Sequence, residues 1–110
     1  MANTFKNFRN AMTTTGATTA YTCPTATTAI VLHLQVANID GVNSADATVH
    51  WTDDSNSDAV TQLVKTTPVV GNIALSVLTG KLVLETGDTI VATASADGDL
   101  ILSGSVLEMT

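Results

Sequence analysis

The fold is decided by the stretch Thr28-Ala-Ile-Val-Leu-His-Leu-Gln-Val-Ala-Asn-Ile39, which the turn Asp40-Gly41 separates from the segment Ala47-Thr-Val-His-Trp-Thr52. In both segments apolar side chains recur at every second position, as they do in β-strands with one buried face. The side chains predicted to share one face are Ile30, Leu32, Leu34 and Val36 in the first segment and Ala47, Val49 and Trp51 in the second. Both segments are therefore expected to be strands, with Trp51 as an anchor of the core.

Segments of the same kind fill the chain from residue 18 onward. Their frequent Thr and Val residues are β-branched and fit a pleated sheet. Turn residues such as Asp97-Gly98-Asp99 interrupt the pattern about every 8–12 residues, which is typical of sandwiches and barrels. The further strand-like segments are Thr18–Thr22, Val60–Thr66, Ile73–Val77, Lys81–Leu84, Ile90–Ala94 and Leu100–Met109. The predicted fold is all-β: a single antiparallel β-sandwich of about eight strands, either a jelly roll or immunoglobulin-like.

Length and charge exclude several classes of protein. A chain of 110 residues has the size of one domain. Ten acidic residues against four basic ones give a net charge of −6, which disfavours nucleic acid because phosphate binding needs clustered cations. No apolar run approaches the ~18 residues of a membrane span, and residues 1–10 lack the apolar region of a secretion signal. We expect neither a nucleic-acid nor a membrane partner.

The first sixteen residues differ from the rest in charge. Residues 1–16 contain Lys6 and Arg9 and no acid, whereas residues 17–110 contain all ten acids and only two lysines. We therefore predict an N-terminal arm, 1–16, followed by a sandwich domain, 17–110. Phe5, Phe8 and Met12 recur at the spacing of one stripe on a short helix. This stripe either packs into the protein's own core or binds another subunit, and in the second case Phe5, Phe8, Arg9 and Met12 are the partner-binding residues.

One polar loop, Asp53–Asp58, resembles the beginning of a calcium-binding loop. Asp54, Asn56 and Asp58 supply oxygen atoms at alternate positions, which suits a hard cation. The pattern then fails, because Ala59 stands where the loop needs glycine and a lysine falls where the bidentate glutamate belongs. The loop is interpreted as a polar turn, and no metal is expected.

Catalytic chemistry has few candidates in this sequence. His33 and His50 lie on the polar sides of two predicted strands, and together with the lone Cys23 they are too few for a zinc site. Because Cys23 is the only cysteine, the chain cannot form an internal disulfide. No serine lies in a nucleophile elbow, and no phosphate-binding glycine motif is present. We expect a protein that is not an enzyme and binds no cofactor.

Two predicted strands carry apolar residues on both faces. Val31 lies opposite the face of Ile30, and in the last strand Ile101 and Leu107 lie opposite Leu102 and Val106. A half-exposed antiparallel sheet should alternate apolar and polar residues. The second apolar face is therefore expected to be covered by a copy of the same chain or by another subunit.

Both ends of the sequence resemble small virion structural proteins of tailed bacteriophages. The resemblance is carried by Met1–Asn7 with Thr14–Pro24, and by Leu84–Asp88 through to Gly104–Thr110. It implies a compact β-sandwich present in many copies on a virion, and the family has no catalytic residues to carry over. It favours a capsid decoration or cement protein whose partners are copies of itself, with a trimer as the first choice, and the major capsid protein.

Two other functions remain open at this point. A tail, neck or baseplate protein could use the same sandwich as an adaptor or fibre base. A receptor- or glycan-binding module would need aromatic platforms, for which the sequence offers only Tyr21 and Trp51.

Overall fold

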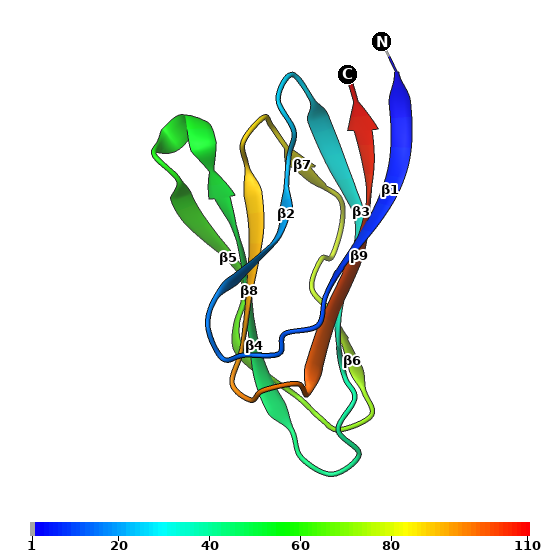
Figure 1. Cartoon of the computed structure of the whole chain (residues 1–110), viewed down its shortest axis with the longest axis vertical. Helices are drawn as coiled ribbons and strands as arrows, with labels where there is room; N and C mark the ends of the chain where they lie inside the picture. The colour runs from blue at the N-terminus through cyan, green and yellow to red at the C-terminus, as the bar shows by residue number, and fades with distance from the viewer. Residues whose placement is uncertain (1) are drawn as a thin grey trace.

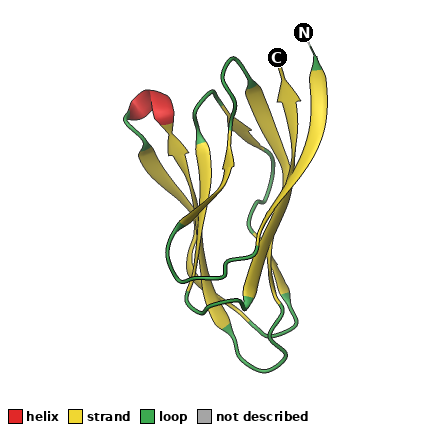
Figure 2. Ribbon diagram, in the orientation of Figure 1, coloured by secondary structure: helices red, strands yellow, loops and turns green. Residues whose placement is uncertain are grey.

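The computed structural model describes residues 2–110, and in this range the chain is built from β-strands. Figure 2 shows strands throughout, with one short 3-10 turn among the described residues, η1 (Asp54–Asn56). The strands are β1 (Asn3–Asn10), β2 (Thr18–Thr22), β3 (Thr28–Asn38), β4 (Ala45–Asp53), β5 (Ala59–Val69), β6 (Ala74–Ser76), β7 (Leu82–Leu84), β8 (Thr89–Ala94) and β9 (Leu100–Met109). The predicted all-β fold is confirmed.

The strands form two antiparallel sheets that pack face to face (Figure 1). The first sheet has the order β1-β9-β3-β6, with β7 also paired to β3, and the second has the order β2-β8-β4-β5. The two ends of the described chain lie together, because residues 2 and 110 exchange backbone hydrogen bonds of 3.2 and 2.9 Å. The loops β3–β4 and β5–β6 lie at the opposite end of the long axis (Figure 1).

The strand pairing distinguishes between the two predicted sandwich topologies. β4 pairs with β5, β3 with β6 and β7, β2 with β8, and β1 with β9, as in one long folded hairpin. The further pairs β3–β9 and β4–β8 form where this hairpin rolls into two sheets. This arrangement is a jelly roll, in which β6 and β7 occupy one interrupted strand position and about eight positions are filled.

The core lies between the inner faces of the two sheets. Alternate residues of β4, β8 and β9 point into it, as the sequence predicts, and Trp51 packs against it. Its buried side chains are Met12, Cys23, Ala29, Val31, Leu34, Val36, Ala45, Ala47, Val49, Val69, Val77, Leu84, Ile90, Ala92, Ala94, Leu100, Leu102 and Val106. Burying aliphatic side chains contributes about 1.5–3 kcal/mol each, which makes this interior the main source of stability.

One prediction about the inner face of β3 is wrong. The register of β3 against β9 shifts between Val31 and His33, which adds one residue to β3. This β-bulge reverses the alternation. As a result Ile30 and Leu32 do not share the buried face of Leu34: Ile30 faces outward, and Leu32 is exposed.

None of the residues from 2 to 110 belongs to a helix of the length and apolarity needed to cross a bilayer.

Candidate interaction surface

The predicted N-terminal arm forms a strand of the first sheet. Every residue of β1 pairs with one of β9, from Asn3 opposite Met109 to Asn10 opposite Leu102. The expected helical stripe is therefore wrong, since residues three apart in a strand face opposite sides. A helix this short is marginal in water, whereas the edge of β9 offers backbone hydrogen bonds along the whole segment.

Phe8 and Met12 pack inside their own subunit. The Phe8 ring stacks on Tyr21 of the second sheet, with centroids 5.2 Å apart and an interplanar angle of 28°. Gly104 makes room for this ring, because a Cβ there would lie 2.5 Å from a Phe8 carbon. Met12 follows β1 and is only 2% exposed. Both side chains thus close one side of the sandwich.

A polar network links β1 to its neighbour β9 and to β2 of the second sheet. The Tyr21 hydroxyl donates to Oε2 of Glu108 at 2.6 Å, and Lys6 Nζ lies 3.0 Å from Oε1 of the same carboxylate. These two contacts lower the pKa of Glu108. Burial, followed by the hydrogen bond to Glu108, raises the pKa of Tyr21. The network joins β1, β2 and β9 and stabilises a nearly buried carboxylate.

Phe5 points away from the core. It is 74% exposed and pairs with Leu107, which lies opposite Ile30, which in turn lies opposite Val83. These four residues form one line across β1, β9, β3 and β7 on the outer face of the first sheet, and we call them the apolar row. Directly opposed side chains in a sheet lie in contact distance, so the row is a continuous apolar strip. The second apolar face predicted for β9 is thus confirmed.

The outer face around this row carries no acidic side chain among the described strand residues. Arg9 lies on it, as does His33 beside the β-bulge. By register the face comprises Asn3, Phe5, Asn7, Arg9, Thr28, Ile30, His33, Gln35, Ala37, Ala74, Ser76, Val83, Ile101, Ser103, Ser105, Leu107 and Met109. The ten acids of the chain therefore all lie elsewhere, and the face combines the apolar row with uncharged polar residues and the positive charge of Arg9.

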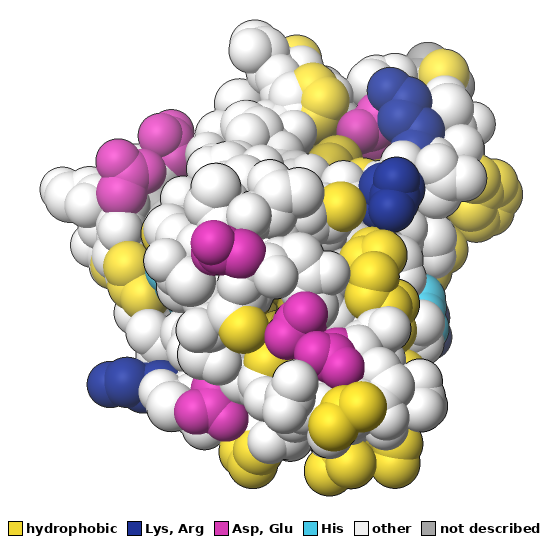
Figure 3. All heavy atoms as spheres, turned by 60° about the horizontal axis from the view of Figure 1, so that its bottom comes forward, with side chains coloured by type: hydrophobic (Ala, Val, Ile, Leu, Met, Phe, Trp, Pro, Cys, Tyr) yellow, Lys and Arg dark blue, Asp and Glu magenta, His cyan; other side chains and the backbone are white. Residues whose placement is uncertain are grey.

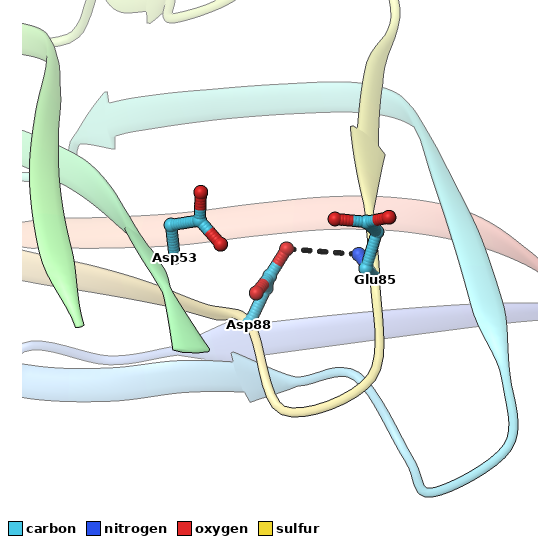
Figure 4. A group of neighbouring side chains, drawn as sticks. All are labelled: Asp53, Glu85 and Asp88. Atoms are coloured by element: carbon cyan, nitrogen blue, oxygen red, sulfur yellow. Dashed lines mark hydrogen bonds between the residues drawn. The ribbon is translucent and has the colours of Figure 1, made fainter. Parts of the chain in front are cut away.

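Three acidic residues that the sequence did not group as ligands lie together at the end of the sandwich near the termini. Carboxylate oxygens of Asp53, Glu85 and Asp88 lie within 4.8 Å of one another (Figure 4). Oxygen clusters of this kind suit hard cations. Here, however, both oxygens of Asp88 already accept backbone hydrogen bonds of 2.9 Å, from Asp54 and from Glu85.

Asp88 therefore organises two turns. Its carboxylate joins η1 to the β7–β8 turn, where Gly87 has a φ of 86° and packs against Asp54 so closely that a Cβ would overlap that side chain. The proximity of the three acids follows from this turn structure. Asp54, Asn56 and Asp58, which the sequence aligned with a calcium loop, lie in or beside η1 instead of in a calcium-binding loop.

The remaining predicted side chains do not combine into a site. His33 lies on the outer face of the first sheet, whereas His50 lies on that of the second, so the sandwich separates them. Cys23 is buried, and desolvation raises its thiol pKa. The ring of Tyr21 is engaged by Phe8 and its hydroxyl by Glu108.

Comparisons with known proteins agree on the fold. A chain of the Bacillus endospore appendages, which form a family of disulfide-linked pili, is 13% identical, with a TM-score of 0.51 over 99% of this chain and 85% of its own. A chain from the acid-stable capsid of Helicobacter pylori bacteriophage KHP30 is 9% identical, with a TM-score of 0.57 over 100% of this chain and 89% of its own. No protein-family model matches the sequence, and no curated protein matches it. At these identities the likeness is one of fold.

Proposed function

We propose that the chain is a non-enzymatic structural subunit of a virus particle, and more specifically a capsid decoration or cement protein of a phage head. The observation that carries the proposal is the acid-free outer face of the first sheet, on which the apolar row crosses four strands. A single domain rarely leaves a contiguous apolar strip in water unless another molecule covers it. The described residues of this chain do not cover it.

Fold and resemblance support the same proposal. Jelly rolls recur in viral capsid domains, although the fold by itself does not define a function. Both ends of the sequence resemble small phage virion proteins. Two of the solved structures with a similar fold come from a phage capsid and from pili, which are assemblies of many subunits.

The partners proposed are copies of the same chain and the major capsid protein. A closed homo-oligomer, with a trimer as the first choice, would cover the apolar row on each copy. Covering this row removes apolar surface from water, which is the dominant favourable contribution to most protein association.

A glycan-binding role has less support. Sugars stack on exposed aromatic rings, but Trp51 is half-buried against the core and Tyr21 is held by Phe8 and Glu108.

Cryo-electron microscopy of the source particle tests the proposal. The expected result is density for this jelly roll at many symmetric positions on the outside of the head. Density at the neck, tail or baseplate would contradict the decoration role while retaining the virion role. Absence of the chain from purified particles would overturn the proposal as a whole.

A further inference from the structure

The end of the sandwich opposite the termini presents four exposed aliphatic side chains. Ile39 and Val42 belong to the β3–β4 loop, and Val70 and Ile73 to the β5–β6 loop; each is more than half exposed, and Val42 is 87% exposed. We call this group the apolar tip. Figure 3, with this end turned toward the viewer, shows hydrophobic side chains gathered at the lower edge and acidic side chains beside them.

The two loops of the tip are held rigidly by Asn38, a buried polar residue. Its Nδ2 donates to the carbonyls of Asn43 and Val69 at 3.0 and 2.8 Å, and its Oδ1 accepts from the backbone of Asp40 at 2.8 Å. Its backbone N–H donates to the carbonyl of Ile73 at 2.9 Å, and its backbone carbonyl accepts from the N–H of Asn72 at 3.1 Å. This amide therefore joins both loops.

Two further features fix the same loops. The Asp40 carboxylate accepts backbone hydrogen bonds from Val42 and Asn43, which lower its pKa. Gly71 lies so close to the β3–β4 loop that a Cβ on this residue would be 2.6 Å from the carbonyl oxygen of Asp40. Loops held in this way lose little further conformational freedom on binding, which favours association.

Acidic residues lie around the apolar tip. Asp40 lies in the β3–β4 loop, and the adjoining β8–β9 turn contains Asp97 and Asp99, with the Asp99 carbonyl accepting a 2.8 Å bond from the backbone of Ile39. The three segments at this end, residues 39–44, 70–73 and 95–99, contain no lysine or arginine. Such a surface is repelled by anionic lipids and suits a partner that is apolar and positively charged.

The same chain carries a surface of that kind. The outer face of the first sheet combines the apolar row with Arg9 and has no acid on its described strand residues. Figure 1 shows that the tip lies at the far end of the molecule from the chain ends, near which β1 begins. The Phe5 end of the apolar row therefore cannot cover the apolar tip of the same molecule.

We propose that the apolar tip of one copy packs on the outer face of the first sheet of the next copy, beside Phe5 and Arg9. This inference rests on the proposed self-association and names the two surfaces that make it. Because the surfaces are different, the contact is heterologous. Such contacts close into a ring when the rotation between copies permits it.

Disulfide trapping between two single variants tests the contact. Val42→Cys and Phe5→Cys are purified separately, mixed at micromolar concentration and oxidised mildly. The native Cys23 is buried and gives little background. We expect the mixture to form the Val42–Phe5 cross-link at least tenfold faster than either variant cross-links with itself. A Val60→Cys variant, with an exposed site on the second sheet, replaces Phe5→Cys as the matched control and should not cross-link to Val42→Cys.

Light scattering of the native protein separates the possible failures. An oligomer without the Val42–Phe5 cross-link overturns this inference and leaves the proposed self-association intact. Fast cross-linking of Val42→Cys to itself also overturns it, because the tips would then meet about a two-fold axis. A monomer in solution contradicts both proposals for the free protein.

Discussion

The two outer faces of the sandwich are built from similar β-branched and aliphatic residues but arrange them differently. On the first sheet the apolar row crosses β1, β9, β3 and β7. On the second sheet the corresponding line across β2, β8, β4 and β5 is Thr22, Thr89, Thr52 and Val60, so that threonine fills three of its four positions. The hydroxyls of Thr52 and Thr89 hydrogen-bond to each other.

This difference shows that the residues which favour a strand are not always residues which favour an interface. Threonine fits a strand as well as valine or isoleucine does, because all three are branched at Cβ. Its hydroxyl, however, lets the second sheet face water at little cost, whereas the apolar row gains by leaving water. The fold needs β-branched residues on both faces, whereas the proposed interface depends on the uninterrupted apolar row of the first sheet.

The largest effect is expected from removing the strand that borders the first face. Deletion of residues 1–15 removes all of β1, together with Phe8 and Met12 from the interior. Losing a buried Met side chain costs about 2–5 kcal/mol, and losing the partly buried Phe8 and the β1 hydrogen bonds adds to this, which approaches the ~5–15 kcal/mol total stability of a domain. The truncated chain should be unfolded by circular dichroism.

A folded and soluble truncated chain would show that β1 is dispensable. The segment would then be an arm in function, as its charge and spacing suggest. This outcome would shift the partner-binding role from the face of the first sheet to the segment alone.

The next largest effect should follow from replacing apolar residues of the apolar row by threonine, the residue that predominates in the corresponding line of the second sheet. The double variant Ile30→Thr and Leu107→Thr keeps β-branching at the first position and adds hydroxyls to the apolar row. We expect loss of self-association by sedimentation velocity, with the fold intact. The matched control, Val60→Thr with Val91→Thr on the second sheet, should sediment like the native protein. Equal behaviour of the two double variants would break the contrast between the faces.

A smaller effect is expected from the acid that anchors β1. The folded state lowers the pKa of Glu108, so its contribution to stability is present above the ordinary glutamate pKa of about 4.3 and is lost as the pH falls through the lower folded value. Glu108→Gln should therefore flatten the fall of Tm with acidification in this range. Asp97→Asn, at an exposed acid, is the control and should keep the native pH profile; an unchanged profile for Glu108→Gln would show that the network contributes nothing.

The smallest effect is expected from metal. Because the Asp88 carboxylate is already occupied by backbone donors, millimolar calcium should leave the Tm equal, within error, to that in chelator. Asp88→Ala should lower the Tm by the same amount in both buffers, since it removes the link between η1 and the β7–β8 turn. A calcium-dependent rise in the native Tm would identify Asp53, Glu85 and Asp88 as ligands.

The sequence predicted the features that depend on local alternation. Ala47, Val49, Ile90 and Leu102 face the core as expected, because a period of two is a property of each strand by itself. The β-bulge in β3 was not predictable in this way. It is set by the register against β9, and it moved Ile30 to the outer face.

The candidate surface was only partly predictable because its parts are distant in sequence. Asn3 pairs with Met109, and Tyr21 bonds a carboxylate 87 positions away. Nothing near Phe5 in the sequence indicates that β9 will be its neighbour, so the spacing of the aromatic residues suggested a helix. The apolar tip was missed for the same reason, since Val42 and Val70 come together only when two loops share Asn38.

The most direct test of the account is the mass of the native chain by light scattering at micromolar concentration. If a second copy covers the outer face of the first sheet, the measured mass will be a stable whole multiple of 11.3 kDa. A mass of 11.3 kDa that does not change with concentration would contradict the claim that this face is a contact between copies.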